Sequence, residues 1–155
     1  MSPELWYEDL MPGQRYITSG RTITETDLIV FSMLSGDWNP IHVDEKFCSG
    51  TAFGTRVVHG VLGIAIITGL MDRAGWFSTS AIAMLGIDAW KFHAPIMVGQ
   101  TLHAEMVIGE TRRTRDPRRG IVQREFSLVT HDGDVLQSGK IPMLIACRDV
   151  EVNSP

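Results

Sequence analysis

The segment Ser35 to Asp44 carries two side chains that can move protons. It reads Ser-Gly-Asp-Trp-Asn-Pro-Ile-His-Val-Asp and places Asp37 and His42 five residues apart. Pro40 restricts the backbone between them, which would help to hold the carboxylate and the imidazole in register. A positioned carboxylate and histidine can act as general acid and general base. We therefore expect acid–base chemistry at this segment.

A third chemical group is expected at Gly60, where an apolar segment predicted to be helical begins. The first N–H groups of a helix have no partner within it, and the helix dipole favours an anion there. Glycine lets a ligand oxygen approach its N–H closely. Hydrating a conjugated thioester needs a base for water, an acid for the α-carbon and a donor for the thioester oxygen. Asp37, His42 and Gly60 could supply these functions together.

Two helices are expected to position these groups. Thr24 followed by Asp27 is a capping pattern that predicts the start of the first helix, and Gly36 is well placed to end it. We expect residues 36–58 to be irregular, because the segment contains Asn-Pro and several glycines. The second helix is predicted from about Gly60 to Arg73. It is apolar on every side, so it should be buried all round.

The second half of the chain is predicted to form an antiparallel meander. A two-residue alternation of apolar and polar residues is clearest after Thr101, and His131 to Asp134 is a hairpin signal. Pro142 should lie at an edge or a bulge. With a short strand within Arg15–Ile23, the expected strands are Ile82–Phe92, Thr101–Thr111, Ile121–Thr130 and Val135–Ala146.

These elements predict an α+β domain in which a sheet wraps one long central helix. One curled sheet would leave that helix partly uncovered. We therefore expect a second copy of the chain to complete its burial, in a homodimer or a higher homo-oligomer.

Composition narrows the classes of protein. The 155 residues suit a single domain, 1–155, and the formal net charge of −4 argues against nucleic-acid binding. Two distant cysteines and the absence of a signal-peptide pattern favour a reduced, cytoplasmic protein. The apolar stretch Val61 to Met71 is too short to cross a membrane, which needs roughly 20 residues. No metal-binding or nucleotide-binding motif is recognised, so neither a metal nor a separate cofactor is expected.

The run Gly36 to Asp44, followed by His59-Gly60 and the apolar helix, resembles the MaoC-like dehydratase family, which includes the (R)-specific enoyl-CoA hydratases. The resemblance continues through Phe92–Thr101 and the hairpin Arg112–Gly120, and covers residues 10 to 147. It implies a hotdog fold that dimerises so that two sheets join. It also implies a hydro-lyase that converts a 2-enoyl-CoA into an (R)-3-hydroxyacyl-CoA and needs no cofactor beyond the coenzyme A of its substrate.

The resemblance also implies roles for individual residues. Asp37 and His42 match the catalytic pair that activates water, and Gly60 matches the glycine whose N–H contacts the thioester oxygen. Asn39 matches a residue that supports the pair. Thr68 falls where several family members carry a serine near the pocket. His59 is a further candidate for substrate contact.

Structural explanations remain open for each of these residues. Asp37 could cap a local turn, and His42 could be satisfied by a backbone carbonyl. His59 could hold the start of the helix, and Thr68 could bond the carbonyl four residues back. The basic hairpin Arg112–Arg119 could meet the phosphates of coenzyme A or could be a solvated turn.

Two other functions also remain open. An acyl-CoA thioesterase on the same fold could use the same carboxylate, helix start and water, with attack on the carbonyl carbon. A non-catalytic acyl-CoA-binding subunit would need no acid and base. Fold alone discriminates poorly between such chemistries.

Overall fold

A computed structural model describes residues 4–148. Residues 1–3 and 149–155, which the predicted single domain includes, lie outside the described part. In chain order the elements are η1 (Tyr7–Asp9), β1 (Arg15–Ile17), β2 (Arg21–Thr22), α1 (Glu25–Ser35), α2 (Pro40–Val43), α3 (Glu45–Ser49), α4 (Gly60–Ala74), β3 (Ala81–Met84), β4 (Asp88–Phe92), β5 (Thr101–Arg113), β6 (Arg119–Thr130), β7 (Val135–Lys140) and β8 (Met143–Ala146).

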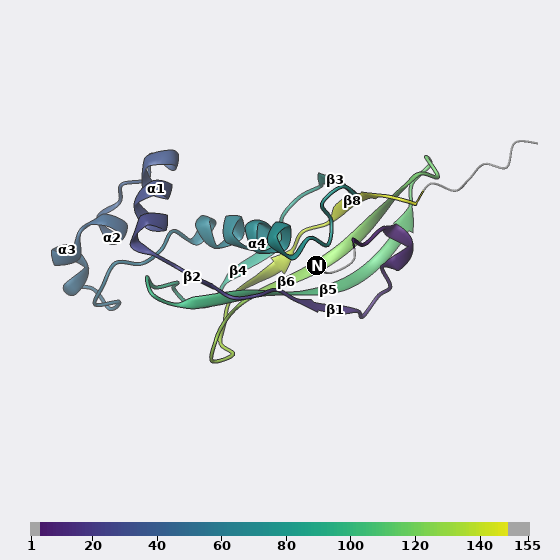
Figure 1. Cartoon of the computed structure of the whole chain (residues 1–155). Coiled ribbons are helices and arrows are strands. Elements are labelled where there is room, and N and C mark those ends of the chain that lie inside the picture. Colours follow the sequence, from purple (N-terminus) through teal and green to yellow (C-terminus); the bar gives the residue numbers. More distant parts are fainter. Residues whose placement is uncertain (1–3, 149–155) are drawn as a thin grey trace, which may run out of the picture.

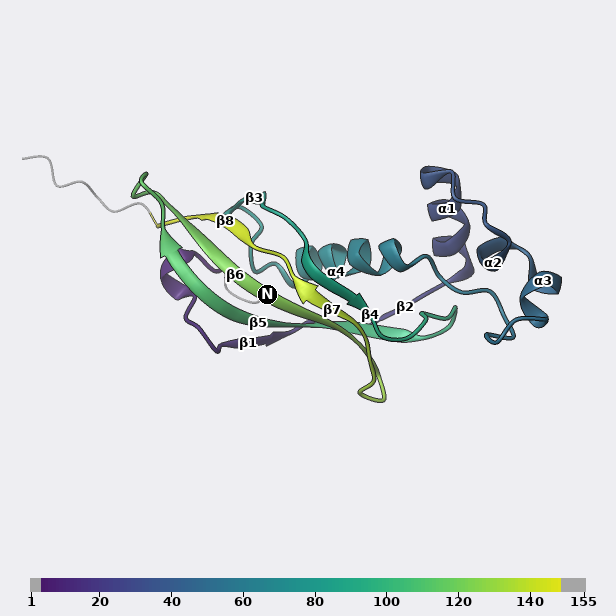
Figure 2. The same ribbon diagram turned by 180° about the vertical axis from the view of Figure 1, so that it is seen from behind.

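All strands join one antiparallel sheet that curves around a single long helix. The main strand order is β1-β5-β6-β7-β4, while β2 pairs with β5, and β8 pairs with both β3 and β6. Figures 1 and 2 show α4 lying along one face of this sheet, and α1, α2 and α3 grouped beyond one end of it. This arrangement confirms the predicted α+β architecture, with a long helix wrapped by antiparallel strands.

The core lies between α4 and the inner face of the sheet. Along β5, the side chains of Leu102, Ala104, Met106 and Ile108 are buried, and the residues between them are only half-buried. This two-residue period is the one read from the sequence, and it directs one face of β5 toward the helix.

The helix α4 is buried on one side only within a single chain. Gly63, Ile66, Ile67 and Leu70 face the core, whereas Val61 is 62% exposed. Ala65 and Gly69 are exposed as well. Within one chain the sheet covers only one side of the helix, as expected of a single curled sheet, and burial all round stays a prediction for a homodimer or a higher homo-oligomer.

The helix α1 begins and ends at the predicted residues. The Thr24 hydroxyl accepts from the Asp27 N–H, and the Asp27 carboxylate accepts from the Thr24 N–H in return. Partial burial raises the pKa of Asp27, but hydrogen bonds from Thr24 and the adjacent Arg21 guanidinium outweigh this and lower the pKa below its usual value. At the other end, Gly36 adopts a left-handed conformation with φ of 75°, which glycine adopts without strain.

Residues 36–58 are not simply irregular, as the sequence predicted, because two short helices form within them. Asn39 caps α2 by accepting the Ile41 N–H, and Pro40 occupies the first helical position, where no N–H is needed. Asp44 caps α3 in the same way through the Phe47 N–H. The Asn-Pro pair, read from the sequence as a break, is here the start of a helix.

Three predicted strands are each divided into two. Residues 82–92 contain β3 and β4, which pair with β8 and β7 respectively. Residues 135–146 form β7 and β8, separated by Ile141-Pro142, since proline cannot donate to a ladder. Arg15–Ile23 contains β1 and β2, which pair with different parts of β5. The sequence pattern did not separate the halves, which differ in the strand, or the part of a strand, with which they pair.

Within residues 4–148, every helix is too short or too polar to span a lipid bilayer.

Candidate functional site

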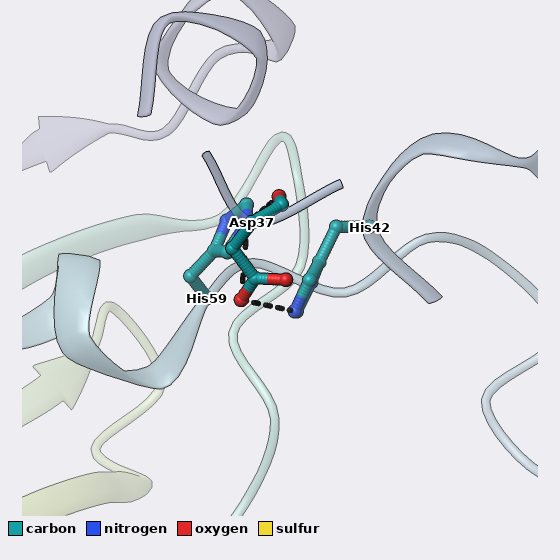
Figure 3. A group of neighbouring side chains, drawn as sticks. All are labelled: Asp37, His42 and His59. Carbon is teal, nitrogen blue, oxygen red and sulfur yellow. Dashed lines mark hydrogen bonds and ion pairs between the residues drawn. The ribbon is translucent and has the colours of Figure 1, made fainter. Parts of the chain in front are cut away.

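Asp37, His42 and His59 meet where the loop after α1 crosses the start of α4 (Figure 3). The Asp37 carboxylate oxygen Oδ2 lies 3.9 Å from His42 Nε2 and also 3.9 Å from His59 Nε2. The two imidazole rings are stacked, with centroids 3.7 Å apart and planes inclined by 23°. The structure thus brings together the two predicted acid–base residues and adds a second histidine beside them.

The orientation of His42 is set by its other ring nitrogen. Nδ1 lies 2.7 Å from the carbonyl oxygen of Val57. A carbonyl oxygen can only accept, so Nδ1 carries the proton and neutral His42 presents a lone pair on Nε2. That lone pair faces the Asp37 carboxylate across a distance that suits a bridging water, since each of its hydrogen bonds would be about 2.8 Å long. The side chain of Asp37 is 52% exposed, so water can reach it.

His59 occupies a buried structural position and is only 3% exposed. It is the N-cap residue of α4, and its Nε2 lies 3.0 Å from the carbonyl oxygen of Asp37. Nε2 therefore donates to that carbonyl and ties the loop to the helix start. Nδ1 of His59 is buried without a hydrogen-bond partner among the described residues. This geometry supports the open structural explanation for His59 more than direct substrate contact.

The same three residues have the composition of a metal site. Their ligand-type atoms lie within 4.8 Å of one another. His59 Nε2, however, carries its proton toward the Asp37 carbonyl, and a metal ligand must be deprotonated. The absence of a metal therefore stays a prediction. His42 Nε2 and the Asp37 carboxylate are the groups that face a molecule entering the site.

Asn39 supports the loop through its backbone and side chain. Its N–H donates to Asp37 Oδ1 over 3.2 Å, which leaves Oδ2 as the oxygen nearer the two imidazoles. Its side-chain oxygen caps α2, the helix that carries His42. Asn39 thus links the carboxylate to the helix of the histidine and acts within the loop.

Gly60 opens α4 and lines a cavity of about 360 Å³ together with His42. As the first helical residue, its N–H has no partner within the helix. A Cβ at this position would lie 2.8 Å from the ring of Phe92, which lines the same cavity. A larger residue at this position would therefore have to displace the ring of Phe92.

Gln137 is a residue of this site that sequence reasoning missed. Its side chain is 1% exposed and lines the same cavity. Its Nε2 donates to the carbonyl of Gly60 over 3.0 Å, and its Oε1 accepts from the indole N–H of Trp90 over 3.2 Å. Gln137 thus anchors the first turn of α4 to β7. The available signal was a polar residue in an otherwise apolar strand position.

Two predicted candidates lie away from the pair. Thr68 is eight residues along α4 from Gly60, donates to the carbonyl of Ala65 three residues back, and lines a separate cavity. The turn within Arg112–Arg119 lies at the end of the sheet opposite α1–α3 (Figure 1). There, both Arg118 and Arg119 pair with Asp116.

Comparison with known sequences gives matches over most of the chain. Residues 9–129 match the sequence model of the MaoC like domain. The chain is 35% identical over 101 residues to Protein MaoC of Klebsiella aerogenes, a match that takes in 65% of the chain and only 30% of that protein. It is 33% identical over 103 residues to an (R)-specific enoyl-CoA hydratase of Rhodospirillum rubrum, which covers 66% of the chain and 69% of the relative.

Solved structures share the fold. The (R)-hydratase from A. caviae superposes with a TM-score of 0.71 and 26% identity, covering 88% of this chain and 97% of that one. A Mycobacterium tuberculosis protein with a double hotdog fold gives a TM-score of 0.82 at 16% identity, over 98% of this chain and 46% of that one. The latter shows the fold alone, and this chain corresponds to about half of it.

Proposed function

Because the chain belongs to the MaoC-like domain family, we propose that it reversibly hydrates a 2-enoyl-CoA to a 3-hydroxyacyl-CoA of (R) configuration. One observation carries this proposal: the lone pair of His42 Nε2 faces the Asp37 carboxylate at 3.9 Å. An enzyme that adds water to a double bond needs such a pair of acceptors around one water molecule.

In the proposed hydration, water sits between Asp37 and His42. Asp37 accepts a hydrogen bond from the water and holds it in place. His42 Nε2 removes the other proton of the water as its oxygen bonds to the β-carbon. The electron pair of the double bond moves toward the thioester oxygen. The resulting imidazolium then returns its proton to the α-carbon, so that both new bonds form on one face. Dehydration is the reverse.

The negative charge that develops on the thioester oxygen would be received by the N–H of Gly60. Gly60 shares its cavity with His42, which supports the thioester lying between them. A preorganised donor of this kind typically contributes about 10²–10³ in rate. The reaction needs no separate cofactor, because the thioester itself activates the β-carbon.

We further propose that a second copy of the chain covers the exposed side of α4 and the neighbouring strand β3. Every residue of β3 is exposed in the single chain, including Ile82 at 45% and Met84 at 54%. Val61 on α4 and Leu34 on α1 are also exposed. The correspondence of this chain to half of a double hotdog protein supports such a pairing. Sedimentation equilibrium that yields only the monomer mass would contradict it.

Crotonyl-CoA, which carries a short 2-enoyl chain, tests the proposed reaction. We expect loss of the conjugated-enoyl absorbance without release of free thiol, and an (R)-3-hydroxy product on chiral chromatography. Asp37→Asn should lower kcat strongly, while Asp44→Asn, at the cap of α3, serves as a matched loop control with near wild-type activity. Thiol release would instead identify a thioesterase. Binding of acyl-CoA with no turnover of any enoyl-CoA would identify a binding subunit.

A further inference from the structure

A second cavity, of about 320 Å³, lies between α4, β3 and the inner face of β6. Its wall is mainly apolar and includes Ile67, Met71, Phe77, Ile82, Phe126 and Met143. A cavity of this size and lining suits a hydrocarbon chain. Of the two charged side chains in the wall, the buried one does not fit that description.

That side chain is Arg124, which is only 6% exposed. Its Nε donates to the carbonyl of Ile141 over 3.0 Å. Its guanidinium carbon lies 5.6 Å from the ring centre of Phe77 and 5.3 Å from that of Phe126. Within residues 4–148, no ion pair or further side-chain hydrogen bond of Arg124 is found, and its two terminal nitrogens are not among the fully buried atoms that lack a partner, so they are accessible to solvent.

An unpaired buried cation is costly, which is why buried charges in proteins are normally paired. Burial lowers the pKa of Arg124 to about 10, so the group still carries its charge at neutral pH. Two aromatic rings and one carbonyl satisfy only part of a guanidinium with five N–H donors. Asp72, the carboxylate in the cavity wall, is exposed and makes no ion pair with Arg124. Within residues 4–148 of one chain, the guanidinium thus has no carboxylate partner, and its terminal nitrogens are open to a molecule that enters the cavity from solvent.

The helix α4 lines both this cavity and the cavity at the proposed reaction site. Gly60 lines the first cavity, and Thr68 and Met71 line the second. Residues at helical positions 60, 64, 67, 68 and 71 share one face of the helix. A rise of 1.5 Å per residue places Thr68 about 12 Å along the axis from Gly60. An acyl chain of medium length, starting at a thioester held by Gly60 and following this face, would reach Arg124.

We propose that Arg124 receives a carboxylate at the far end of the acyl chain, so that the preferred substrates are coenzyme A thioesters of dicarboxylic acids. This inference rests on the proposed function for the position of the thioester. A guanidinium pairs with a carboxylate through two parallel hydrogen bonds, which would occupy the terminal nitrogens. The apolar wall would hold the intervening methylene groups.

A site built for a charged group discriminates strongly against an analogue that lacks it, because the partner is then left unpaired. We expect an acyl-CoA ending in a carboxylate to bind about 100-fold more tightly than the methyl-ended acyl-CoA of equal length. The preference should be greatest for the chain length that spans from Gly60 to Arg124.

Calorimetric titration with saturated acyl-CoA pairs, one carboxylate-ended and one methyl-ended at each length, tests this without requiring turnover. Arg124→Met removes the charge at similar side-chain volume and should abolish the preference. Arg124→Lys keeps a positive charge and should retain part of it. Arg112→Met, which replaces an exposed arginine on β5, is the matched control and should leave the preference unchanged.

The outcomes separate this inference from the proposed function. A wild-type protein that binds both members of every pair equally would overturn the role of Arg124, whatever the protein does to crotonyl-CoA. A preference that survives in Arg124→Met would overturn it as well. If no 2-enoyl-CoA is hydrated, whether methyl-ended or carboxylate-ended, but the carboxylate preference is present and lost in Arg124→Met, the anion site stands and the hydratase proposal fails. If Arg124→Met does not fold, the wild-type and Arg124→Lys measurements decide.

Discussion

Replacing His42 by asparagine should separate its chemical role from its structural one. The side-chain amide of asparagine can place an N–H near the position of Nδ1, and so keep the hydrogen bond to the Val57 carbonyl. It has no group at the position of Nε2, where the lone pair faces Asp37. Loss of a positioned base should lower kcat by about 10²–10⁴-fold. This corresponds to about 3–5 kcal/mol of activation free energy, at about 1.4 kcal/mol for each factor of ten.

Comparing His42→Asn with His42→Ala tests the structural role of the His42 side chain. Alanine removes the base and also leaves the Val57 carbonyl, on a residue only 6% exposed, without its partner. An unsatisfied buried acceptor costs about 1–3 kcal/mol, so His42→Ala should unfold more easily in urea than His42→Asn by roughly that amount. Both variants should be equally inactive. Hydration of crotonyl-CoA, followed by enoyl absorbance, measures the activity.

Two results would refute this reasoning. If His42→Asn kept more than about a tenth of the wild-type kcat, Nε2 would not be the base. If His42→Asn and His42→Ala had the same free energy of unfolding, the hydrogen bond to Val57 would not orient the ring.

Three further predictions follow from contacts in the structure. Gly60→Ala should lower kcat, because the new Cβ would lie 2.8 Å from the Phe92 ring, and adding Phe92→Leu should restore part of the loss in the same enoyl assay. Gln137→Leu should lower the free energy of unfolding by about 2 kcal/mol, since two buried hydrogen bonds are lost; no change in a urea titration would show that water replaces them. The lowered pKa of Asp27 contributes stability above its unfolded pKa that is lost as pH falls through the folded value. Asp27→Asn should therefore reduce stability at pH near 7 and flatten its decline below about pH 4, whereas an unchanged acid profile in urea titrations would exclude this role.

Much of the fold could be predicted because its signals are local. The capping box of Thr24 and Asp27, the left-handed Gly36 and the alternation along β5 each depend on residues a few positions apart. The strand division at residues 85–87 could not be placed from the pattern, whereas Pro142 did indicate an irregularity at the second division. The two halves of residues 82–92 are separated by their different partners in the sheet, because β3 pairs with β8 and β4 pairs with β7.

The residues of the candidate site also differ in how far they could be predicted from the sequence. Asp37, His42 and Asn39 lie in one short segment, and the Asn-Pro spacing sets much of their arrangement locally. Gln137 and Arg124 come from strands far along the chain. In a strand, each reads as a polar exception, and nothing nearby shows what it faces.

The sequence by itself determined which groups can move a proton, where the central helix begins, and that its first N–H groups are unpaired. Tertiary structure alone decided that His59 stacks on His42 and donates to the Asp37 backbone, that Gln137 anchors the first helical turn, and that Arg124 lines a mainly apolar cavity. The physical reason is the distance along the chain over which each kind of interaction acts. Capping and turn formation act within a few residues, whereas burial and charge compensation depend on neighbours that only the folded sheet brings together.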